Sequence, residues 1–518
     1  MPTTPHALPD GAAVAGHPAL VPFDESNRAL RDHVSPEGWR NPDPAARYHL
    51  VVVGAGTAGL VTAAAAAGLG ARVALVERHL MGGDCLNVGC VPSKGVIRAA
   101  RAWAAAADAG RRFAGPSLGG QGDFGAVMSR MRALRARLAP VDGAPRFRDL
   151  GVDVFLGAGR FVAPDALEVD GVRLRFTRAV IATGARAALP PIPGLADAGP
   201  LTNDTLFSLT ERPDHLVILG AGAIGCEMAQ SFARFGARVT LLDQAPRILP
   251  RDDASAAAIV QRALERDGVQ VVTGASVTGV SRAGDRRTVH YATAEGTTGE
   301  ASGDALLVAL GRAPNVEQLG LDVAGVAWSR SGITVDDFLR TTSRRIFAIG
   351  DVSSPFKFTH SADFQARAVV QNALFHGRAR ASRLVIPWTT YTSPELAHVG
   401  LTAADAERAG TRVDVVTVPF HEVDRAVLDG EEDGMLTVVL AKGTDRILGA
   451  TLVAEHAGDM IGEVVLAMTA GVGLAPIGRT IHPYPTQGEV FRRAADAWRR
   501  RKLTPTVRRI LAAWFRWT

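Results

Sequence analysis

The chain has 518 residues, of which 47% are hydrophobic and 21% charged, and its formal net charge is +5. This length exceeds what one hydrophobic core organises, so several domains are expected. The composition is that of a soluble globular protein, and no window of about 20 apolar residues predicts a membrane span. A net charge of +5 is too small to indicate a nucleic-acid partner. Three cysteines favour a reducing, cytoplasmic location over a secreted disulfide scaffold.

Residues 1–47 hold prolines, glycines and scattered charges, without the apolar run that a signal peptide carries. The first strand pattern begins at Tyr48. We therefore expect residues 1–47 to be an extension that lies over the protein surface or is partly disordered.

Residues 48–78, YHLVVVGAGTAGLVTAAAAAGLGARVALVER, predict a strand, a turn, a helix and a second strand. The turn contains Gly54, Gly56 and Gly59, and the second strand ends at Glu77. In dinucleotide-binding folds such glycines allow a tight turn and let the pyrophosphate approach the helix N-terminus, while the acid binds a ribose hydroxyl. This segment therefore predicts a dinucleotide site.

The same pattern recurs in residues 214–244, DHLVILGAGAIGCEMAQSFARFGARVTLLDQ. Gly220, Gly222, Gly225 and Asp243 follow their counterparts at one constant offset, so the chain is predicted to hold two dinucleotide sites. One flavin site and one nicotinamide site is the most economical interpretation. Two nicotinamide sites, the alternative, would leave no acceptor for the hydride.

Cys85 and Cys90 lie five residues apart, just before a run that predicts a helix. Residues five apart in a regular helix are separated by about 7.5 Å of rise, so the chain must bend between them if the thiols are to form a disulfide. The spacing alone leaves a redox pair, a structural disulfide and a metal pair open, although no further Cys or His cluster completes a metal site. The third cysteine, Cys226, is predicted to be an inert thiol packed within a helix.

Residues 48–497 resemble the pyridine nucleotide–disulfide oxidoreductases, which include dihydrolipoamide dehydrogenase, glutathione reductase and mercuric reductase, and in particular the bacterial mercuric-reductase-like members. The resemblance rests on VVVGAGTAGL, GGDCLNVGCVPSK, VIATGA, VILGAGAIGCEMA, ALGRAPN, RRIFAIGDV and HPYPTQGE, in this order. It implies an α/β fold with two Rossmann-like domains, for FAD and NAD(P), and a C-terminal α+β dimerisation domain in a homodimer. The implied segments are the N-terminal extension 1–47, the FAD domain 48–193 and 318–384, the NAD(P) domain 194–317, the dimerisation domain 385–497 and a basic tail 498–518.

The resemblance also implies roles for individual residues. Cys85 and Cys90 would form a redox-active disulfide, with Cys90 nearer the flavin and Cys85 exchanging with substrate. Their position at a helix start is expected to lower the thiol pKa. Lys94 would lie under the flavin ring and pair with Glu227. NAD(P)H would reduce FAD, and the reduced flavin would open the disulfide at Cys90. The positions assigned to cofactor binding are Gly54, Gly56, Gly59, Glu77, Gly83, Lys94, Thr183, Gly184, Gly220, Gly222, Gly225, Asp243, Gly311, Arg312, Gly350 and Asp351.

The C-terminal motif departs from the family. Dihydrolipoamide dehydrogenase and glutathione reductase carry a His five residues before a Glu, and this pair acts as the base for the thiol. Here Glu489 is preceded at that spacing by Tyr484, and His482 is two positions away. Tyrosine has an ordinary pKa of about 10, so it is a poor base near neutral pH. Tyr484 and Glu489 are still expected at the catalytic site, with Tyr484 as a substrate contact.

The final electron acceptor stays open. Mercuric reductase also has a tyrosine in this region, but its C-terminal cysteine pair has no counterpart in the tail RRILAAWFRWT. No resident metal site is predicted. Three hypotheses remain: a flavoenzyme that reduces a small acceptor such as a metal ion, a quinone or a small disulfide; a dihydrolipoamide-type dehydrogenase; and a redox-switched, membrane-associated regulatory protein.

Two further expectations concern the coenzyme and the tail. Asp243 favours NADH, because a carboxylate accepts from the ribose 2′-OH and repels a 2′-phosphate, although Arg247 weakens this preference. Residues 503–518 predict a basic amphipathic helix that Thr504 caps and Pro505 opens. We expect it to pack on the protein body or on the dimer partner, with peripheral contact to the inner face of the membrane as the alternative. Its apolar stripe is Val507, Ile510, Leu511, Trp514 and Trp517.

Overall fold

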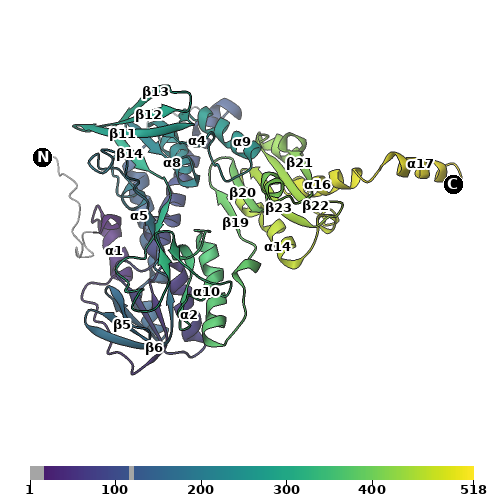
Figure 1. Ribbon diagram of the computed structural model, residues 1–518. Coiled ribbons are helices and arrows are strands. Elements are labelled where there is room, and N and C mark those ends of the chain that lie inside the picture. The colour runs from purple at the N-terminus through teal and green to yellow at the C-terminus, as the bar shows by residue number, and fades with distance from the viewer. Residues whose placement is uncertain (1–16, 116–121) are drawn as a thin grey trace. The chain divides into compact units, whose positions relative to one another are not determined.

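The computed structural model describes residues 17–115 and 122–518, so the first 16 residues of the predicted extension lie outside the described residues (Figure 1). The chain divides into two compact units. The first comprises residues 1–220, 231–239 and 277–384, and the second comprises residues 221–230, 240–276 and 385–518. The predicted α/β class is confirmed, because parallel strands alternate with helices in both Rossmann-like segments. The predicted domain borders stay a prediction.

A sheet with the order β3-β2-β1-β6-β5-β4 forms the centre of the first unit, and β18 also pairs with β6. Strands β1, β2, β3, β6 and β18 run parallel, while β4 and β5 pair antiparallel. β1 and β2 are Val- and Leu-rich and almost entirely buried, as expected for strands covered on both faces. Their bounds are β1 Tyr48–Val53, β2 Val73–Glu77, β3 Val152–Leu156, β4 Gly159–Ala163, β5 Ala166–Val169, β6 Val172–Ile181 and β18 Ile346–Ala348.

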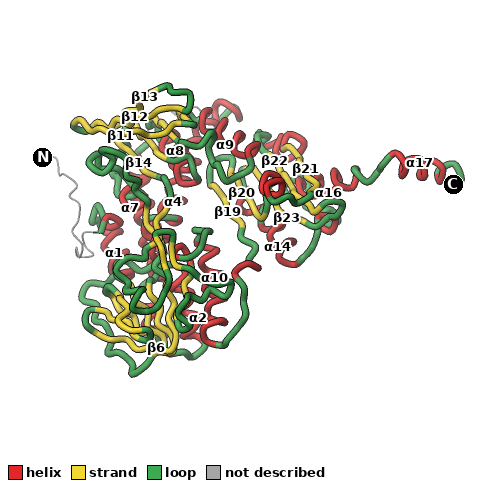
Figure 2. The backbone as a smooth tube through the Cα atoms, in the orientation of Figure 1, coloured by secondary structure: helices red, strands yellow, loops and turns green. Residues whose placement is uncertain are grey.

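Helices α2 and α10 lie against each other beside this sheet (Figure 2). The alanine-rich sequence of α2 allows this close approach, since Ala58, Ala63 and Ala66 are buried. The helices between residues 57 and 374 are α2 Thr57–Gly68, α3 Gly83–Asn87, α4 Cys90–Arg112, α5 Phe124–Asp142, α6 Ala144–Asp149, α7 Asn203–Leu206, α8 Ala223–Arg234, α9 Ala254–Arg266 and α10 Thr359–Leu374, with the short helix η3 Gly350–Val352.

The second Rossmann-like segment has a four-stranded sheet with the order β10-β9-β8-β14 and a three-stranded sheet with the order β11-β12-β13. Two further sheets are pairs, β15-β7 and β16-β17. The bounds are β7 Ala185–Ala187, β8 His215–Leu219, β9 Arg238–Leu242, β10 Val269–Val272, β11 Ala275–Ala283, β12 Arg286–Thr293, β13 Thr298–Gly303, β14 Ala305–Val308, β15 Arg312–Pro314, β16 Trp328–Ser329 and β17 Gly332–Ile333.

The C-terminal segment forms a five-stranded antiparallel sheet with the order β19-β20-β23-β22-β21, which confirms the predicted α+β domain. Helix α16 presents Val490, Phe491 and Trp498 to its core. The bounds are η4 Ala381–Arg383, β19 Pro387–Thr390, β20 Glu395–Gly400, α11 Ala403–Arg408, β21 Val413–Pro419, η5 Phe420–Glu422, α12 Asp424–Asp429, β22 Met435–Ala441, β23 Ile447–Ala454, α13 Ala457–Met460, α14 Gly462–Ala470, α15 Leu474–Ile477, α16 Glu489–Arg500 and α17 Pro505–Trp514.

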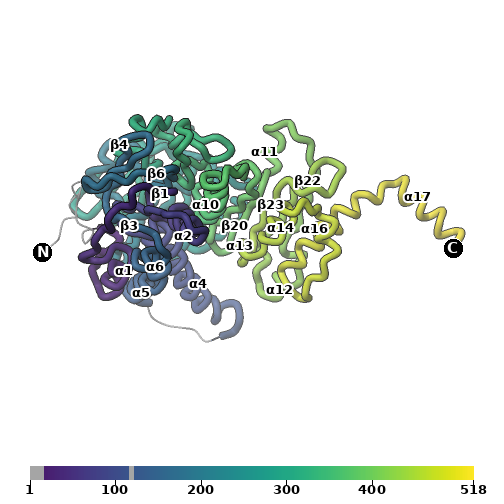
Figure 3. The backbone as a smooth tube through the Cα atoms, turned by 90° about the horizontal axis from the view of Figure 1, so that it is seen from below, coloured from purple at the N-terminus to yellow at the C-terminus, as the bar shows by residue number. Residues whose placement is uncertain are grey.

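The described part of the N-terminal extension contributes side chains to the protein core, so it is more than the layer over the surface that we expected, and the expected partial disorder of the extension stays a prediction. Short helix η2 (Pro18–Leu20) precedes α1 (Glu25–Val34), which lies beside α5 and α6 (Figure 3). Leu20, Leu30 and Val34 have no exposed surface and share one core cluster with the β1 strand. Helix α1 has few apolar residues, so its sequence pattern did not predict that one of its faces is buried.

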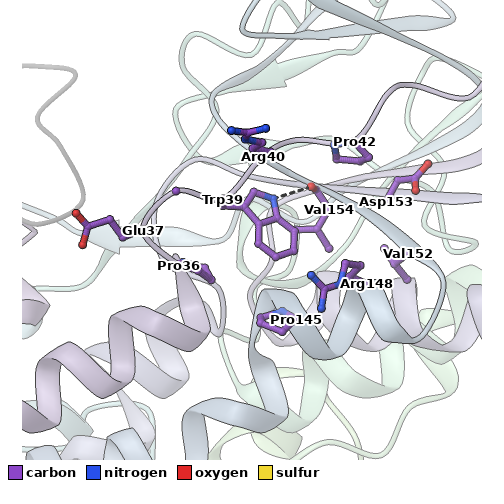
Figure 4. Close-up of a pocket in the computed structure, with 11 residues that line it drawn as sticks. Pro36, Glu37, Trp39, Arg40, Pro42, Pro145, Arg148, Val152, Asp153 and Val154 are labelled. Atoms are coloured by element: carbon purple, nitrogen blue, oxygen red, sulfur yellow. Dashed lines mark hydrogen bonds between the residues drawn. The ribbon is translucent and has the colours of Figure 1, made fainter.

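The extension continues along strand β3. The Trp39 indole N–H donates to the Val154 carbonyl at 3.2 Å, and Asn41 exchanges hydrogen bonds with the backbone of Leu156. A pocket of about 390 Å³ surrounds Trp39, between the extension, α6 and β3, and Figure 4 shows the residues that line it. None of the predicted site residues lines this cavity.

Candidate functional site

The turn from β1 into α2 has the geometry that the first glycine motif predicts. Gly54 has φ +100°, and a Cβ there would lie 2.4 Å from the Ala182 carbonyl oxygen. A Cβ on Gly59 would lie 1.8 Å from the Gly54 carbonyl oxygen. The N-cap of α2 is Gly56, and no side chain caps this end. The first N–H groups of α2 are therefore left for a ligand such as a pyrophosphate.

Glu77 ties this turn to the end of β2. Its Oε2 accepts from the Ala55 N–H at 2.7 Å, and its Oε1 accepts from the His79 N–H at 2.9 Å. Burial raises the pKa of Glu77, and these N–H donors partly offset the effect. The carboxylate thus has a structural role in holding the turn, and its predicted contact with a ribose stays a prediction.

The second motif repeats these bonds. Asp243 accepts from the N–H groups of Ala221 at 2.6 Å and Ala245 at 2.7 Å. Gly220 has φ +104°, and a Cβ there would lie 2.5 Å from the Ala309 carbonyl oxygen. Asp243 and its two donors match Glu77, Ala55 and His79 at one constant sequence offset, and the Ala309 carbonyl takes the place of the Ala182 carbonyl at a different offset. The predicted internal repeat therefore extends to individual hydrogen bonds. A Cβ on Gly222 would meet no protein atom within 4 Å.

The two site cysteines lie on consecutive helices. Cys85 is in α3, Cys90 is the first residue of α4, and Val88 and Gly89 form the bend between them. Neither thiol forms a disulfide bond in this structure. The Cys90 Sγ lies 3.3 Å from the Thr359 hydroxyl, at the start of α10. The bend that a disulfide requires is therefore present, but the redox-active disulfide itself stays a prediction.

The Cys85 thiol has the reverse of the expected acidity. Its hydrogen bond with Cys90, followed by burial, raises the pKa of Cys85 well above the ordinary value for a thiol. Two adjacent thiols resist the loss of their second proton, because two negative charges would then lie side by side. The expectation of a lowered pKa is thus wrong for Cys85 in the dithiol form.

The cysteine segment lies directly on the first glycine turn. The Gly82 N–H donates to the Ala55 carbonyl at 2.8 Å. A Cβ on Gly83 would lie 2.7 Å from the Gly56 Cα, which explains why a glycine occupies this predicted cofactor position. The thiols and the first dinucleotide motif are consequently parts of one site.

A buried arginine holds the bend between the cysteines. Arg135, on α5, donates to the carbonyls of Asn87 and Ala19, each at 2.5 Å, and to the Asn27 side-chain oxygen at 2.6 Å. Burial and the nearby Arg132 lower the pKa of Arg135 to about 10. Sequence reasoning missed this residue, because its partners are distant in the chain and no motif contains it.

Arg312 lies between acids from two separate motifs. Its guanidinium contacts the Asp84 carboxylate and the Ala185 carbonyl, and its Nε lies 3.7 Å from Asp351 Oδ2. Burial raises the pKa of Asp351, and Arg312 opposes this shift. Burial also raises the pKa of Asp204, the nearby Asp84 raises it further, and Arg312 lowers it. Sequence reasoning predicted Arg312 and Asp351 but missed Asp84, which precedes Cys85.

The neighbouring loop completes this side of the site. The Thr183 hydroxyl donates to the Asn315 carbonyl at 2.8 Å, and the Asn315 amide donates to the Thr183 carbonyl at 2.9 Å. These reciprocal bonds fix the segment around Gly184. A Cβ on Gly184 or Gly311 would meet no protein atom within 4 Å. Gly350, with φ +71°, precedes Asp351 at the start of η3.

These residues fit FAD. The uncapped N-terminus of α2 suits a pyrophosphate, and Glu77 lies where a ribose is bound in such folds. Open space above Gly184 and Gly311 leaves room for a ligand. Within the described residues, the buried Arg312 Nε has no hydrogen-bond partner, as expected for a group that a bound molecule satisfies.

Lys94 and Glu227 lie on different units, and their pairing stays a prediction. Lys94 is one turn beyond Cys90 on α4. Glu227 is buried on α8, which also carries Gly225, and its Oε1 accepts from the Tyr391 N–H at 2.9 Å. Cys226 is buried, and its thiol donates to the Ala221 carbonyl at 3.4 Å. Burial raises the pKa of Cys226, in agreement with an inert thiol.

The C-terminal motif separates its polar residues into distinct pairs. Tyr484 is 71% exposed, and its hydroxyl donates to Asp424 Oδ2 at 3.0 Å, which raises the pKa of Tyr484. Glu489 is buried and pairs with Arg492 and Arg493. His482 pairs instead with Glu463, with 3.1 Å between the imidazole Nε2 and the carboxylate. Sequence reasoning missed this imidazole–carboxylate pair, because Glu463 belongs to another helix.

Among residues 17–115 and 122–518, no group of three or more His, Cys, Asp and Glu side chains could hold a metal ion. No helix in the described part of the chain is long and apolar enough to span a membrane.

Comparison with known proteins shows the family to which the chain belongs. Residues 48–377 match the family described as pyridine nucleotide-disulphide oxidoreductase, and residues 386–495 match its dimerisation domain, which supports a homodimer. The chain is 33% identical over 459 residues to a mercuric reductase of Lysinibacillus sphaericus, covering 87% of this chain and 84% of that protein. It is also 33% identical over 474 residues to the dihydrolipoyl dehydrogenase of Bacillus subtilis (strain 168), covering 88% and 98%.

Among solved structures, the HOCl-induced flavoprotein disulfide reductase RclA from Escherichia coli, in its Cu(II) complex, aligns with a TM-score of 0.77 and 30% identity, covering 87% of this chain and 99% of that one. With the glycine turns, the paired thiols and both domain matches in agreement, the chain belongs to the pyridine nucleotide-disulphide oxidoreductase family and is a flavoprotein oxidoreductase.

Proposed function

We propose that this oxidoreductase passes two electrons from NAD(P)H to a redox-active Cys85–Cys90 pair and from there to a small oxidised acceptor. The supporting observation is the placement of both thiols on the first glycine turn, beside the residues that fit FAD. FAD, when bound, supplies the ring that accepts a hydride from the nicotinamide and returns two electrons to sulfur.

Residues of this chain hold and release the proton of this step. Reduction of the disulfide bond by two electrons leaves two sulfurs, and one proton taken up from solvent stays on Cys85, whose pKa is raised by its bond with Cys90. The Thr359 hydroxyl, 3.3 Å from the Cys90 Sγ, can donate to a thiolate at that position. Reoxidation by the acceptor reforms the disulfide bond and releases the proton from Cys85.

A metal ion, a quinone or a small disulfide is the class of acceptor that we favour. The Tyr484 hydroxyl keeps its proton, because Asp424 raises its pKa, so it does not replace the base that dithiol substrates require. The relatives named mercuric reductase support a metal ion. Dihydrolipoamide oxidation is a second candidate, because His482, two positions before Tyr484, forms an imidazole–carboxylate pair with Glu463 of α14.

NADH is the proposed coenzyme. Asp243 presents a carboxylate at the end of β9, where it would repel a 2′-phosphate. Arg247, the nearest candidate for a phosphate contact, donates instead to the backbone carbonyls of Ile248, Leu249, Pro250 and Asp252. Its guanidinium is therefore held by its own loop. We also propose that the enzyme acts in the cytoplasm, because the chain has only three cysteines, as is usual in a reducing compartment.

An acceptor panel tests this function. FAD-loaded homodimer with NADH would be assayed with Hg(II), Cu(II), a water-soluble quinone, lipoamide and oxidised glutathione. We expect turnover with a metal ion or quinone at least tenfold faster than with lipoamide, and loss of thiol-dependent turnover in Cys85→Ser. Cys226→Ser is the matched control and should retain activity, because its thiol is buried. Lipoamide as the fastest acceptor would favour the dihydrolipoamide alternative, and slow turnover with every acceptor would favour a regulatory protein.

A further inference from the structure

The positive charge of the protein is concentrated in its last 20 residues. Residues 499–518 contain seven of the 57 lysines and arginines and none of the 52 acids, so the first 498 residues carry a formal net charge of −2. Among the residues that the structure describes, no carboxylate pairs with Arg508 or Arg509 on helix α17. The tail is thus a cationic segment on a slightly acidic body.

The same segment exposes an apolar face. Helix α17 starts after Thr504, whose hydroxyl accepts from the Val507 N–H at 3.3 Å, and every residue from Arg501 to Thr518 is exposed. The expected packing of the stripe on the body of the same chain is therefore wrong for the described residues. The exposed apolar side chains are Val507, Ile510, Leu511, Trp514, Phe515 and Trp517, with exposures from 36% to 90%.

Apolar and charged side chains separate on opposite sides of this helix. At about 100° per residue, the apolar side chains from Val507 to Trp517 fall within an arc of roughly 160°. Arg509 and Arg516 project from the opposite side of the helix, and Arg508 lies at the border. Figure 1 shows α17 as the last helix of the chain. A partner that covers this helix must offer apolar groups to the apolar arc and negative charges to the arginines beside it.

We propose that residues 503–518 bind the surface of a lipid bilayer that contains anionic phospholipid, with α17 parallel to the surface. The apolar arc would enter the boundary between headgroups and acyl chains, where tryptophan is favoured, and the arginines would contact lipid phosphates. The body of a second copy of this chain is a poorer occupant, because its formal net charge of −2 offers the arginines far less negative charge than an anionic lipid surface does. The proposal is independent of the electron acceptor.

The test uses full-length, FAD-loaded protein and sedimentation with vesicles of phosphatidylcholine alone or mixed with phosphatidylglycerol. We expect binding only to the mixed vesicles, and weaker binding as salt increases. Each basic residue near an anionic surface strengthens binding about fivefold, so R508Q/R509Q/R516Q should lower the partition coefficient by roughly 100-fold. W514S/W517S should also lose binding. The matched control R330Q/R344Q/R345Q removes the same charge from exposed positions outside the tail and should bind as the unmodified protein does.

Three results would overturn the proposal. The first is that the unmodified protein ignores both kinds of vesicle. The second is that both tail variants bind as tightly as the control. The third is that deletion of residues 503–518 dissociates the dimer in analytical ultracentrifugation, which would identify the tail as a subunit contact. As a control for folding, each variant would be assayed for NADH oxidation with a soluble acceptor. This activity should stay unchanged.

Discussion

Substitution of Arg135 by methionine removes the donor that joins the cysteine bend to the N-terminal extension. The side chain has no exposed surface, and it donates to three oxygens, on Asn87, Ala19 and Asn27. Each buried acceptor that loses its donor costs about 1–3 kcal/mol. Methionine, unlike arginine, carries no charge that must be desolvated on burial. This gain offsets part of the summed cost of the three acceptors that lose their donor. We expect a net loss of about 2–4 kcal/mol for the unit that holds these residues.

Two measurements check this expectation. Chemical denaturation, followed by the fluorescence of released FAD, reports the stability of the unit, and Arg137→Met, at an exposed position of the same helix, is the matched control. The rate of Cys85 and Cys90 alkylation reports the bend itself, and we expect it to rise in Arg135→Met. An unchanged denaturation midpoint together with unchanged alkylation rates would refute the assigned role of Arg135.

Four further predictions concern the site. Cys90→Ser should abolish the long-wavelength absorbance that appears on anaerobic reduction with NADH, whereas Cys85→Ser should keep or enhance it; the reverse result would exchange their roles. Because the Cys90 contact raises the pKa of Cys85, Cys90→Ser should lower that pKa, and Cys85 alkylation should then rise at a lower pH than in the unmodified dithiol. Tyr484→Phe should change acceptor turnover at an unchanged rate of FAD reduction, and Tyr484→His should raise lipoamide turnover; no gain would argue against a missing base. Asp243→Asn should reduce the preference for NADH in kcat/KM, and a higher kcat/KM for NADPH in the unmodified enzyme would contradict the proposed coenzyme.

The local patterns of the sequence predicted the scaffold well. Gly54 and Gly220 mark turns that only residues without a Cβ allow, and Glu77 and Asp243 end the second strand of each repeat. Such features are encoded within about 30 residues, so periodicity and spacing reveal them. The α/β class and the C-terminal α+β domain followed from the resemblance that these motifs carry.

The rest of the site depends on contacts between distant residues. Thr359 contacts Cys90 from 269 positions away, and Arg312 reaches Asp84 over 228 positions. Neither pairing leaves a periodic trace in the sequence. The raised pKa of Cys85 could not be foreseen from its helix either, because it results from a thiol that only the three-dimensional bend brings close.

The Arg135 contacts have a consequence for the order in which the protein assembles during synthesis. Ala19 and Asn27 precede their common partner by 116 and 108 positions. At a translation rate of about 5–20 residues per second, Arg135 is added to the chain roughly 5–20 s after these two residues. The apolar side chains of Leu20, Leu30 and Val34 are solvent-accessible during this interval, since the β1 strand and α5 are also made later. The N-terminal segment is therefore the natural client for a chaperone that binds nascent chains, and a slower codon stretch before residue 135 would lengthen that exposure.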